Sequence, residues 1–398
     1  MKKLQKILGL SLAALMILGL LTGCGGGTTG GNSGSTALPV LKVGVFQPLT
    51  GQNGGGGLQE LYGVEYAHSL FPTVTIAGTE YQIELVVRDN ESDRTKAPDA
   101  ARSLVAEGVT IVVGTYGSGT AIAGGPIFEE AEIPAIAASA TNPQVTIGND
   151  YYFRICFLDP FQGTVMANYA IQNGYTTAAV VSQFGDDYTS GLATFFVNAF
   201  TALGGEIVSE QQFQENATDF RAILTNIKDA NPDFIFSPSS QTVAPLFIKQ
   251  ARELGVETPI AGGDTWDNEM ILDNLDGEAE GVVFSTFFDE GNTESTIAAE
   301  FVAGFREYLA TEKGQTDGAI SAFSALGYDS YLVARAALEA AGSLEGPVIR
   351  DAIAALVFED CVTGTVKFDE IGDAEKNMAF IKIVRDGKFQ FLQTVTVS

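Results

Sequence analysis

The chain alternates short, continuous apolar runs with longer stretches in which apolar residues recur every three or four positions. A short apolar run bounded by turn residues is typical of a buried strand, and the longer periodic stretches are typical of amphipathic helices. In the first part of the chain this pattern predicts strands at residues 41–46, 82–87, 109–113 and 133–137, with helices at 58–68, 96–107 and 120–130. Such alternation indicates a parallel sheet built from βαβ units.

A second series of the same kind follows. Its strands are predicted at residues 177–182, 206–213, 233–237 and 259–261, and its helices at 161–173, 189–203, 219–229 and 243–254. After a strand-like run at 281–288, two long helical patterns at 296–310 and 319–341 precede a hairpin, predicted from 378–384, the Asp386-Gly387 turn and 389–397. The sequence therefore predicts an α/β protein with two similar modules.

The N-terminal residues resemble a bacterial lipoprotein signal. Three lysines precede an apolar run from Ile7 to Leu21, which as a helix would reach about 22 Å, short of the about 30 Å hydrocarbon core. Leu21-Thr22-Gly23-Cys24 resembles a lipobox, which implies removal of residues 1–23 and lipidation of Cys24. Residues 24–39, rich in glycine, serine and threonine, are expected to form a flexible tether. We expect an extracytoplasmic protein held at the bacterial membrane by a lipid anchor.

Composition narrows the possible functions. The chain carries 22 Lys and Arg against 49 Asp and Glu, a formal net charge of −27, which disfavours binding to nucleic-acid phosphates. One histidine and three separated cysteines argue against a metal cluster. The sequence contains no nucleophile elbow, P-loop or metal-ligand spacing. We therefore expect no catalytic residue, no metal, no cofactor and no nucleic-acid partner.

Polar residues follow three predicted strands at their carboxyl ends, where open α/β sheets bind ligands. The strand ending at Val113 is followed by Tyr116, Gly117 and Ser118, and a helix start with glycines favours an anion. Ser139, Ala140 and Thr141 follow the strand ending at Ala137, and Asp264 and Trp266 follow the one ending at Ala261. Each group alone is also typical of a helix cap. Trp266 is either a pocket wall or packed inside its module.

Several segments together resemble one known family. They are the lipobox, the opening LKVGVFQPLTG, VVGTYGSGT, AIAASATNPQVT, YYFRICFLDPFQG and FIKQARELGVETPIAGGD. In this order they resemble the leucine/isoleucine/valine-type periplasmic binding proteins, which are substrate-binding proteins of ABC importers, over residues 41–398. The resemblance implies two Rossmann-like lobes with parallel sheets, joined by three crossovers near residues 153–158, 285–289 and 364–368. Lobe 1 would comprise residues 40–156 with 289–364, and lobe 2 residues 157–288 with 365–398.

The resemblance also implies a binding site for an amino acid. Ser118 and Thr141 match hydroxyls that hold the ligand carboxylate, and Ser139 matches a main-chain contact, with Tyr116, Gly117 and Ala140 beside them. Asp264 matches the acid that pairs with the ligand ammonium, and Tyr188 an aromatic that closes over it. The implied function is that of a monomeric receptor, which delivers an amino acid, of branched-chain type or related, to an ABC permease in the membrane.

Three departures from the family affect this transfer. Gly56 stands where the family often has a bulky residue, so a wall of the pocket is expected to be missing. The polar run 239–241 replaces a second aromatic and is expected to hydrogen-bond a ligand side chain. Ser92 and Gly117 stand at the approximate positions of the family's disulfide, whereas Cys156 and Cys361 are expected as two buried thiols rather than a pair.

Two alternatives stay open at this stage. The same fold could bind an amide, urea or an aromatic acid, or serve as a sensor module. A surface hydrolase, such as a glycosidase, would need a second strand-end carboxylate about 5–10 Å from Asp264. The sequence points to no such partner.

Overall fold

The computed structural model describes residues 37–291 and 295–396 of the 398-residue chain. The predicted signal sequence, Cys24 and the tether up to residue 36 lie outside the described residues, as does Val397 at the predicted end of the hairpin. No helix in the described ranges is both long and apolar enough to cross a membrane.

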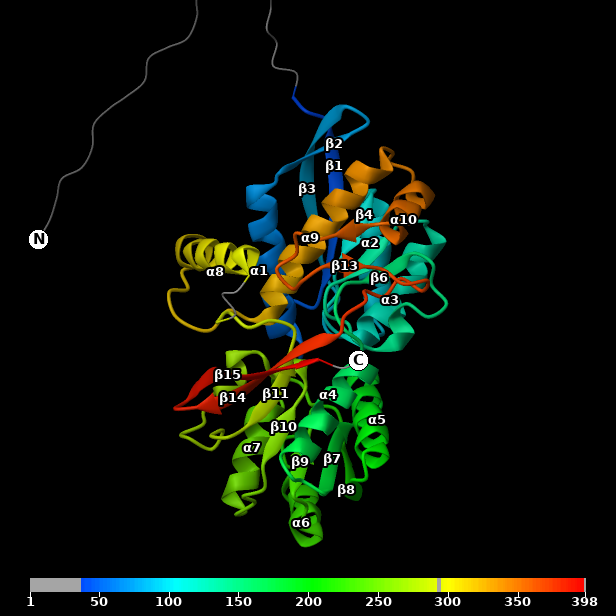
Figure 1. Ribbon diagram of the computed structural model, residues 1–398. Helices are drawn as coiled ribbons and strands as arrows, with labels where there is room; N and C mark the ends of the chain where they lie inside the picture. The colour runs from blue at the N-terminus through cyan, green and yellow to red at the C-terminus, as the bar shows by residue number, and fades with distance from the viewer. Residues whose placement is uncertain (1–36, 292–294, 397–398) are drawn as a thin grey trace, which may run out of the picture. The chain divides into compact units, whose positions relative to one another are not determined.

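The first sheet, in the upper part of Figure 1, has six strands in the order β2-β3-β1-β4-β5-β6. The strands are β1 (Val40–Gln47), β2 (Thr73–Ile76), β3 (Thr79–Asp89), β4 (Ile111–Val113), β5 (Ala135–Ala137) and β6 (Tyr152–Arg154), all parallel except β2. Its helices are α1 (Gly54–Leu70), α2 (Ala97–Glu107), α3 (Ser118–Glu130), α8 (Thr296–Tyr308), α9 (Ala322–Ala341) and α10 (Gly346–Ala354). Helix α9 packs along α1, with α10 against it. We call this assembly lobe 1.

The second sheet has seven strands in the order β15-β14-β11-β10-β9-β7-β8. They are β7 (Thr177–Gln183), β8 (Glu206–Phe213), β9 (Phe234–Phe236), β10 (Ile260–Gly262), β11 (Val283–Thr286), β14 (Met378–Arg385) and β15 (Lys388–Thr396), and only the last two run antiparallel to their neighbours. Helices α4 (Asp159–Gln172), α5 (Asp187–Ala202), α6 (Arg221–Ala230) and α7 (Ala244–Glu253) accompany this sheet, and we call the assembly lobe 2. The α/β class, with two mostly parallel sheets, is confirmed.

The short central strands are buried on both faces, which explains their continuous apolar sequence. In β4, Ile111 and Val113 pack into one apolar cluster and Val112 into another. In β9, Phe234 and Phe236 likewise face away from Ile235. Because successive side chains point to opposite faces of a strand, these runs must be apolar throughout.

The chain passes between the two sheets three times. The first two passages, from β6 to α4 and from β11 to α8, fall where they were predicted. The third does not. Arg154 N donates to Gly372 O and Ala374 N donates to Arg154 O, both at 2.9 Å, so residues 372–374 still pair with β6. The passage therefore follows Ala374 rather than residues 364–368.

Several short elements escaped the sequence pattern. Strand β2 forms a hairpin with β3 through Ala77 and Gly78, which have φ of 48° and 83°. Alanine is an unusual residue for this conformation, so the turn signal was hidden. The two-residue strands β12 (Val357–Phe358) and β13 (Val366–Lys367), and helix α10, are too short to show a period.

Candidate functional site

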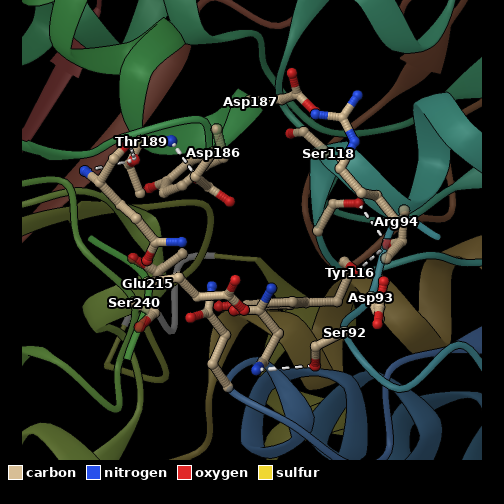
Figure 2. A pocket seen from close by; sticks show the side chains of 18 of the residues that line it. Ser92, Asp93, Arg94, Tyr116, Ser118, Asp186, Asp187, Thr189, Glu215 and Ser240 are labelled. Atoms are coloured by element: carbon tan, nitrogen blue, oxygen red, sulfur yellow. Dashed lines mark hydrogen bonds and ion pairs between the residues drawn. The ribbon is translucent and has the colours of Figure 1, made fainter. Parts of the chain in front are cut away.

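A cavity of about 410 Å³ opens beside the carboxyl ends of strands from both sheets (Figure 2). Lobe 1 contributes Tyr116, Gly117, Ser118 and Ser139, among others. Lobe 2 contributes Tyr188 and Asp264, together with the acidic turn that starts α5 and residues 183–189 around it. The strand-end loops singled out in the sequence thus meet at one cavity.

The lobe 1 wall presents hydrogen-bond donors at the start of α3. Gly117 has a φ of 97°, a conformation that glycine adopts without strain, and Ser118 is the first residue of the helix. The first N–H groups of a helix have no intrahelical partner, and the helix dipole adds positive character there. Ser118 Oγ accepts a hydrogen bond from Asn142 N at 3.2 Å. This wall therefore suits an anionic group.

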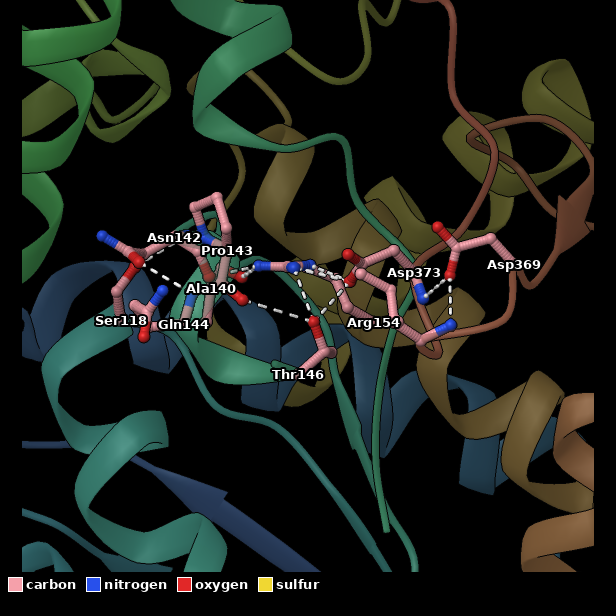
Figure 3. Close-up of polar contacts among 10 residues, drawn as sticks. Ser118, Ala140, Asn142, Pro143, Gln144, Thr146, Arg154, Asp369 and Asp373 are labelled. Carbon is pink, nitrogen blue, oxygen red and sulfur yellow. Dashed lines mark hydrogen bonds and ion pairs between the residues drawn. The ribbon is translucent and has the colours of Figure 1, made fainter. Parts of the chain in front are cut away.

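The neighbouring loop, residues 138–142, is held from behind by a buried arginine (Figure 3). Arg154 donates to Ala140 O at 2.9 Å and to Asn142 O at 2.6 Å. Its charge is paired with Asp373, 2.5 Å away, which also accepts from Thr146 Oγ1. No local pattern in the sequence singles out Arg154, because its partner lies over 200 positions away.

On the lobe 2 side, Asp264 is the acid that faces the cavity. It is 2% exposed, and its Oδ1 accepts from Tyr188 OH at 2.7 Å and from Gln162 Nε2 at 2.8 Å. Burial raises the pKa of the Asp264 carboxyl to about 6, although the two hydrogen bonds lower it. A cationic group in the cavity would favour the ionised carboxylate.

Tyr116 fills the space left by Gly56. A Cβ on Gly56 would lie 2.3 Å from the Tyr116 ring, so the bulky residue expected in the family is incompatible with this tyrosine. The ring packs edge-on against Phe323, and its hydroxyl donates to Gln241 Oε1 of lobe 2 at 2.8 Å. The wall expected to be missing is thus supplied by Tyr116. In the polar run at residues 239–241, Gln241 accepts this hydrogen bond and Ser240 lines the cavity.

Three residues proposed for the site lie outside its lining. Trp266 is fully buried in a core cluster of lobe 2, and its Nε1 donates to Ser239 O at 2.9 Å. Trp266 is therefore packed inside its module and is not a wall of the pocket, because the indole lies tightly against Gly262. Ala140 and Thr141 are buried just behind the lining.

Thr141 faces a second buried acid. Its hydroxyl lies near the Asp159 carboxyl but outside hydrogen-bonding geometry, so both side chains are buried without a partner among the described residues. Burial raises the pKa of Asp159 to about 8. The sequence pattern did not single out Asp159, because an aspartate at the start of a helix is typical of an ordinary cap.

Glu60 is a further buried acid that was not predicted from the sequence. It lies on the buried face of α1 with Gly63, Val64 and Ala67, positions three, four and seven residues further along. A carboxylate on an otherwise apolar helix face was the signal that could have revealed it. Burial raises its pKa to about 8.

The lining is polar and acidic. It contains tyrosines and Phe184, but no alanine, valine, leucine, isoleucine or methionine among the described residues. Arg94 is the one basic residue of this lining in the part of the chain that the structure describes. It lies 3.2 Å from Asp187 across the lobes, and Figure 2 shows these two side chains together. The acidic lining residues are Asp93, Asp186, Asp187, Glu215 and Asp264.

Two of the three cysteines lie among the described residues. Cys156 and Cys361 are free and buried, as predicted. Ser92 Oγ donates to Thr50 O at 2.6 Å and accepts from Asn53 N, so a local hydrogen-bond pair stands near the family's disulfide position. No group of three or more His, Cys, Asp or Glu residues suited to a metal ion occurs in the described ranges.

Comparison with known proteins decides the family. A family model described as periplasmic binding protein matches residues 40–388. The chain belongs to the periplasmic binding protein family. Members of this family bind solutes and are not enzymes, so the expectation of a non-catalytic protein is confirmed.

Similar proteins cover nearly the whole chain. A Leu/Ile/Val-binding protein homolog 1 from Brucella abortus is 28% identical over 367 residues, 90% of this chain and 95% of that protein. The solved leucine binding protein LivK of Thermotoga maritima is 33% identical, with a TM-score of 0.83 over 89% of this chain and 99% of its own. LivJ of Streptococcus pneumoniae, solved with isoleucine, is 29% identical, with a TM-score of 0.80 over 90% of this chain and 99% of its own.

Proposed function

We propose that this periplasmic binding protein is the extracytoplasmic receptor of an ABC importer and binds an amino acid, of branched-chain type or related, between its two lobes. The observation that carries the proposal is the polarity of the cavity: helix-start donors and hydroxyls on lobe 1, and the buried Asp264 on lobe 2. An α-amino acid presents a carboxylate and an ammonium in the same way. The names of the relatives, which refer to leucine, isoleucine and valine, support this class of ligand.

In this proposal the ligand carboxylate binds at the start of α3, held by Ser118 and by the main chain at Ser139, with Thr141 buried behind them. Its ammonium pairs with Asp264, and Tyr188 closes over it. Charge-assisted hydrogen bonds of this kind are about twice as strong as neutral ones. The bonds Tyr116–Gln241 and Arg94–Asp187 join the lobes beside the cavity, as expected for hinge closure around a ligand.

The remaining parts of the proposal concern the setting. Cys24 would carry the lipid anchor, residues 24–39 would act as the tether, and a permease in the membrane would accept the ligand from a monomeric receptor. Mass spectrometry of the mature protein tests the anchor. A diacylglycerol-modified Cys24 as the first residue is expected, and an unmodified N-terminus elsewhere would contradict it.

The role of Asp264 is tested by calorimetry on Asp264→Ala with L-leucine and L-isoleucine. We expect a loss of at least about 2 kcal/mol, close to 30-fold in Kd, because the ligand ammonium would be buried without its counter-charge. Asp273→Ala, which removes an exposed acid of the same lobe, is the control and should bind normally. Equal affinity in both variants would refute this role.

The polar lining favours a second candidate, a receptor of the same fold for a ligand with a polar side chain or for a small amide. An aliphatic side chain would leave Gln183 Oε1, buried without a hydrogen-bond partner in the described residues, unsatisfied. A thermal-shift screen over all amino acids and simple amides separates the candidates. A ligand at 100 times its Kd stabilises by about 2.7 kcal/mol. Stabilisation by leucine, isoleucine or valine supports the first candidate, and stabilisation by polar compounds alone supports the second.

A further inference from the structure

A buried hydrogen-bond relay links the two strand-end loops of lobe 1. One Glu60 oxygen, Oε1, is bonded to Ser139 Oγ. The other, Oε2, accepts from Gln47 Nε2 at 2.5 Å, and Gln47 Oε1 accepts from Tyr116 N at 2.9 Å. Glu60 and Gln47 are fully buried, whereas Ser139 lines the cavity. Glu60 therefore stands directly behind a hydroxyl that faces the ligand.

The surroundings of Glu60 disfavour its ionised form. The charged group that acts on it is Asp264, from the loop after β10, which repels a second negative charge. The other titratable groups that interact electrostatically with Glu60 are Tyr116 after β4, Tyr152 on β6 and Cys156 after β6. All three are neutral at pH 7, because burial raises the pKa of each. Helix α9 presents backbone to it, since Gly327 packs against Glu60 O. None of these groups is a cation.

Burial, reinforced by Asp264, raises the pKa of Glu60 to about 8, although the hydrogen bonds from Ser139 and Gln47 lower it. The carboxyl is therefore protonated at neutral pH. Because Gln47 Nε2 donates to Oε2, the proton belongs on Oε1, the oxygen that faces Ser139.

The position of this proton determines what Ser139 offers to the cavity. A serine hydroxyl has one proton and two lone pairs. When Glu60 is neutral, its O–H donates to Ser139 Oγ, and the serine proton is free to point at the ligand. When Glu60 is ionised, Ser139 must donate to Glu60, and only lone pairs face the cavity. Those lone pairs would repel a carboxylate.

We propose that Glu60 is a positioning residue whose neutral acid form turns the Ser139 hydroxyl into a donor for the anionic group of the ligand. The inference rests on the proposed function, since it places that group on lobe 1. It adds a site interaction, through the Ser139 side chain, to the main-chain contact expected there. Ligand affinity should consequently fall as alkaline pH ionises Glu60.

The test is calorimetry with L-leucine between pH 6.5 and 9 on three proteins. In the wild type we expect affinity to fall about tenfold from pH 7 to pH 9, one power of ten for each pH unit above the pKa. Glu60→Ala should bind more weakly at pH 7, because Gln47 and Ser139 lose their partner. Glu60→Gln should restore most of the affinity, since its carboxamide donates to Ser139 and accepts from Gln47 at every pH.

The pH profile distinguishes this role from a merely structural one. Glu60→Gln should lose the alkaline decline between pH 7 and 9 that the wild type shows. The ligand ammonium titrates equally with both proteins, so it cancels in their ratio. A flat wild-type profile, or the same decline in Glu60→Gln, would overturn the proposal.

A second measurement needs no ligand. The infrared difference spectrum between wild type and Glu60→Gln at pH 7 should show the C=O stretch of a protonated carboxyl, which disappears above pH 8. Absence of this band at pH 7 would overturn the proposal even if binding is normal. If L-leucine binds none of the three proteins, the proposed aliphatic ligand is wrong, and the band still decides the protonation of Glu60.

Discussion

Buried acids set the character of the site at the scale of single residues. Asp264, Asp159 and Glu60 are all buried, and burial raises the pKa of each. The hydrogen-bond partners of Asp264 and Glu60 are neutral hydroxyls and carboxamides rather than basic side chains, and Asp159 has no partner among the described residues. Removing an ion from water is costly, which is why burial favours the neutral form of each acid. Under the proposed function, the ligand ammonium would favour the ionised form of Asp264.

Tyr116 gives a residue-scale prediction about lobe contact. Tyr116→Phe keeps the ring against Gly56 and Phe323 but removes the hydroxyl that donates to Gln241 across the lobes. We expect ligand affinity to fall about fivefold, or about 1 kcal/mol for a neutral hydrogen bond. Tyr331→Phe is the control, because its hydroxyl donates to Phe71 O within lobe 1. Equal ligand Kd values for the two variants, measured by calorimetry, would contradict a role in closure.

The sequence predicted those site residues whose position follows from a local rule. Ser118, Ser139 and Asp264 come directly after apolar strands, and strand ends of an open sheet converge. Glu60 and Arg154 follow no such rule. Glu60 acts because α1 turns its buried face toward the site, and Arg154 because Asp373 returns to β6 from far along the chain. Their roles depend on tertiary packing, which a local pattern does not contain.

At the scale of secondary-structure elements, helix α1 and helix α9 approach closely through glycines. A Cβ on Gly63 would lie 2.0 Å from Ser324 O, and one on Gly327 would lie 2.1 Å from Glu60 O. Backbone cannot move aside as a flexible side chain can. This contact fixes α1, and hence Glu60, against the returning helix.

Gly327→Ala should therefore destabilise the protein. We expect the free energy of unfolding to fall by about 1–3 kcal/mol, the usual cost of overpacking, when measured by urea denaturation. The control is Ala340→Ser on the exposed end of the same helix, which should stay within about 0.5 kcal/mol of wild type. If the Gly327→Ala protein is as stable as this control, then α1 and α9 can move apart to accommodate the added methyl group without cost.

The element pattern was predictable where both faces of a strand are buried. The predictions for the buried strands β4, β5, β9 and β10 agree with the structure to within a few residues, and β8, which lies at the edge of its sheet, also has its predicted bounds of 206–213. The third crossover was misplaced because β13 is only two residues long and because the ties between 372–374 and β6 join distant parts of the chain. Long-range backbone pairing leaves no periodic trace in the sequence.

For the whole molecule, the raised pKa values predict how stability depends on pH. Glu60 and Asp159 have pKa values of about 8, and Asp264 and Asp329 of about 6, all above their ordinary values because of burial. Between pH 4.5 and 8 the folded chain holds protons that the unfolded chain has released. The free energy of unfolding must then fall as pH rises.

We expect the ligand-free protein to melt several degrees higher at pH 5.5 than at pH 8.5. Each such group contributes up to about 1.4 kcal/mol per pH unit between its unfolded and folded pKa. The formal net charge of −27 acts in the same direction, because self-repulsion grows as acids ionise. Glu60→Gln should flatten the pH profile of Tm measured by calorimetry. A Tm that rises toward pH 8.5 would contradict the assignment of buried neutral acids.

The acidic cavity lining has a consequence for transport under the proposed function. Among the described residues, the lining brings five acidic side chains together with one arginine. An unoccupied receptor therefore gains little from shutting, because like charges approach one another as water leaves. A ligand with an ammonium group offsets this repulsion, so the closed form becomes the favoured one. The permease would then distinguish ligand-bound from empty receptors by their shape. It would not hydrolyse ATP after contact with an empty receptor.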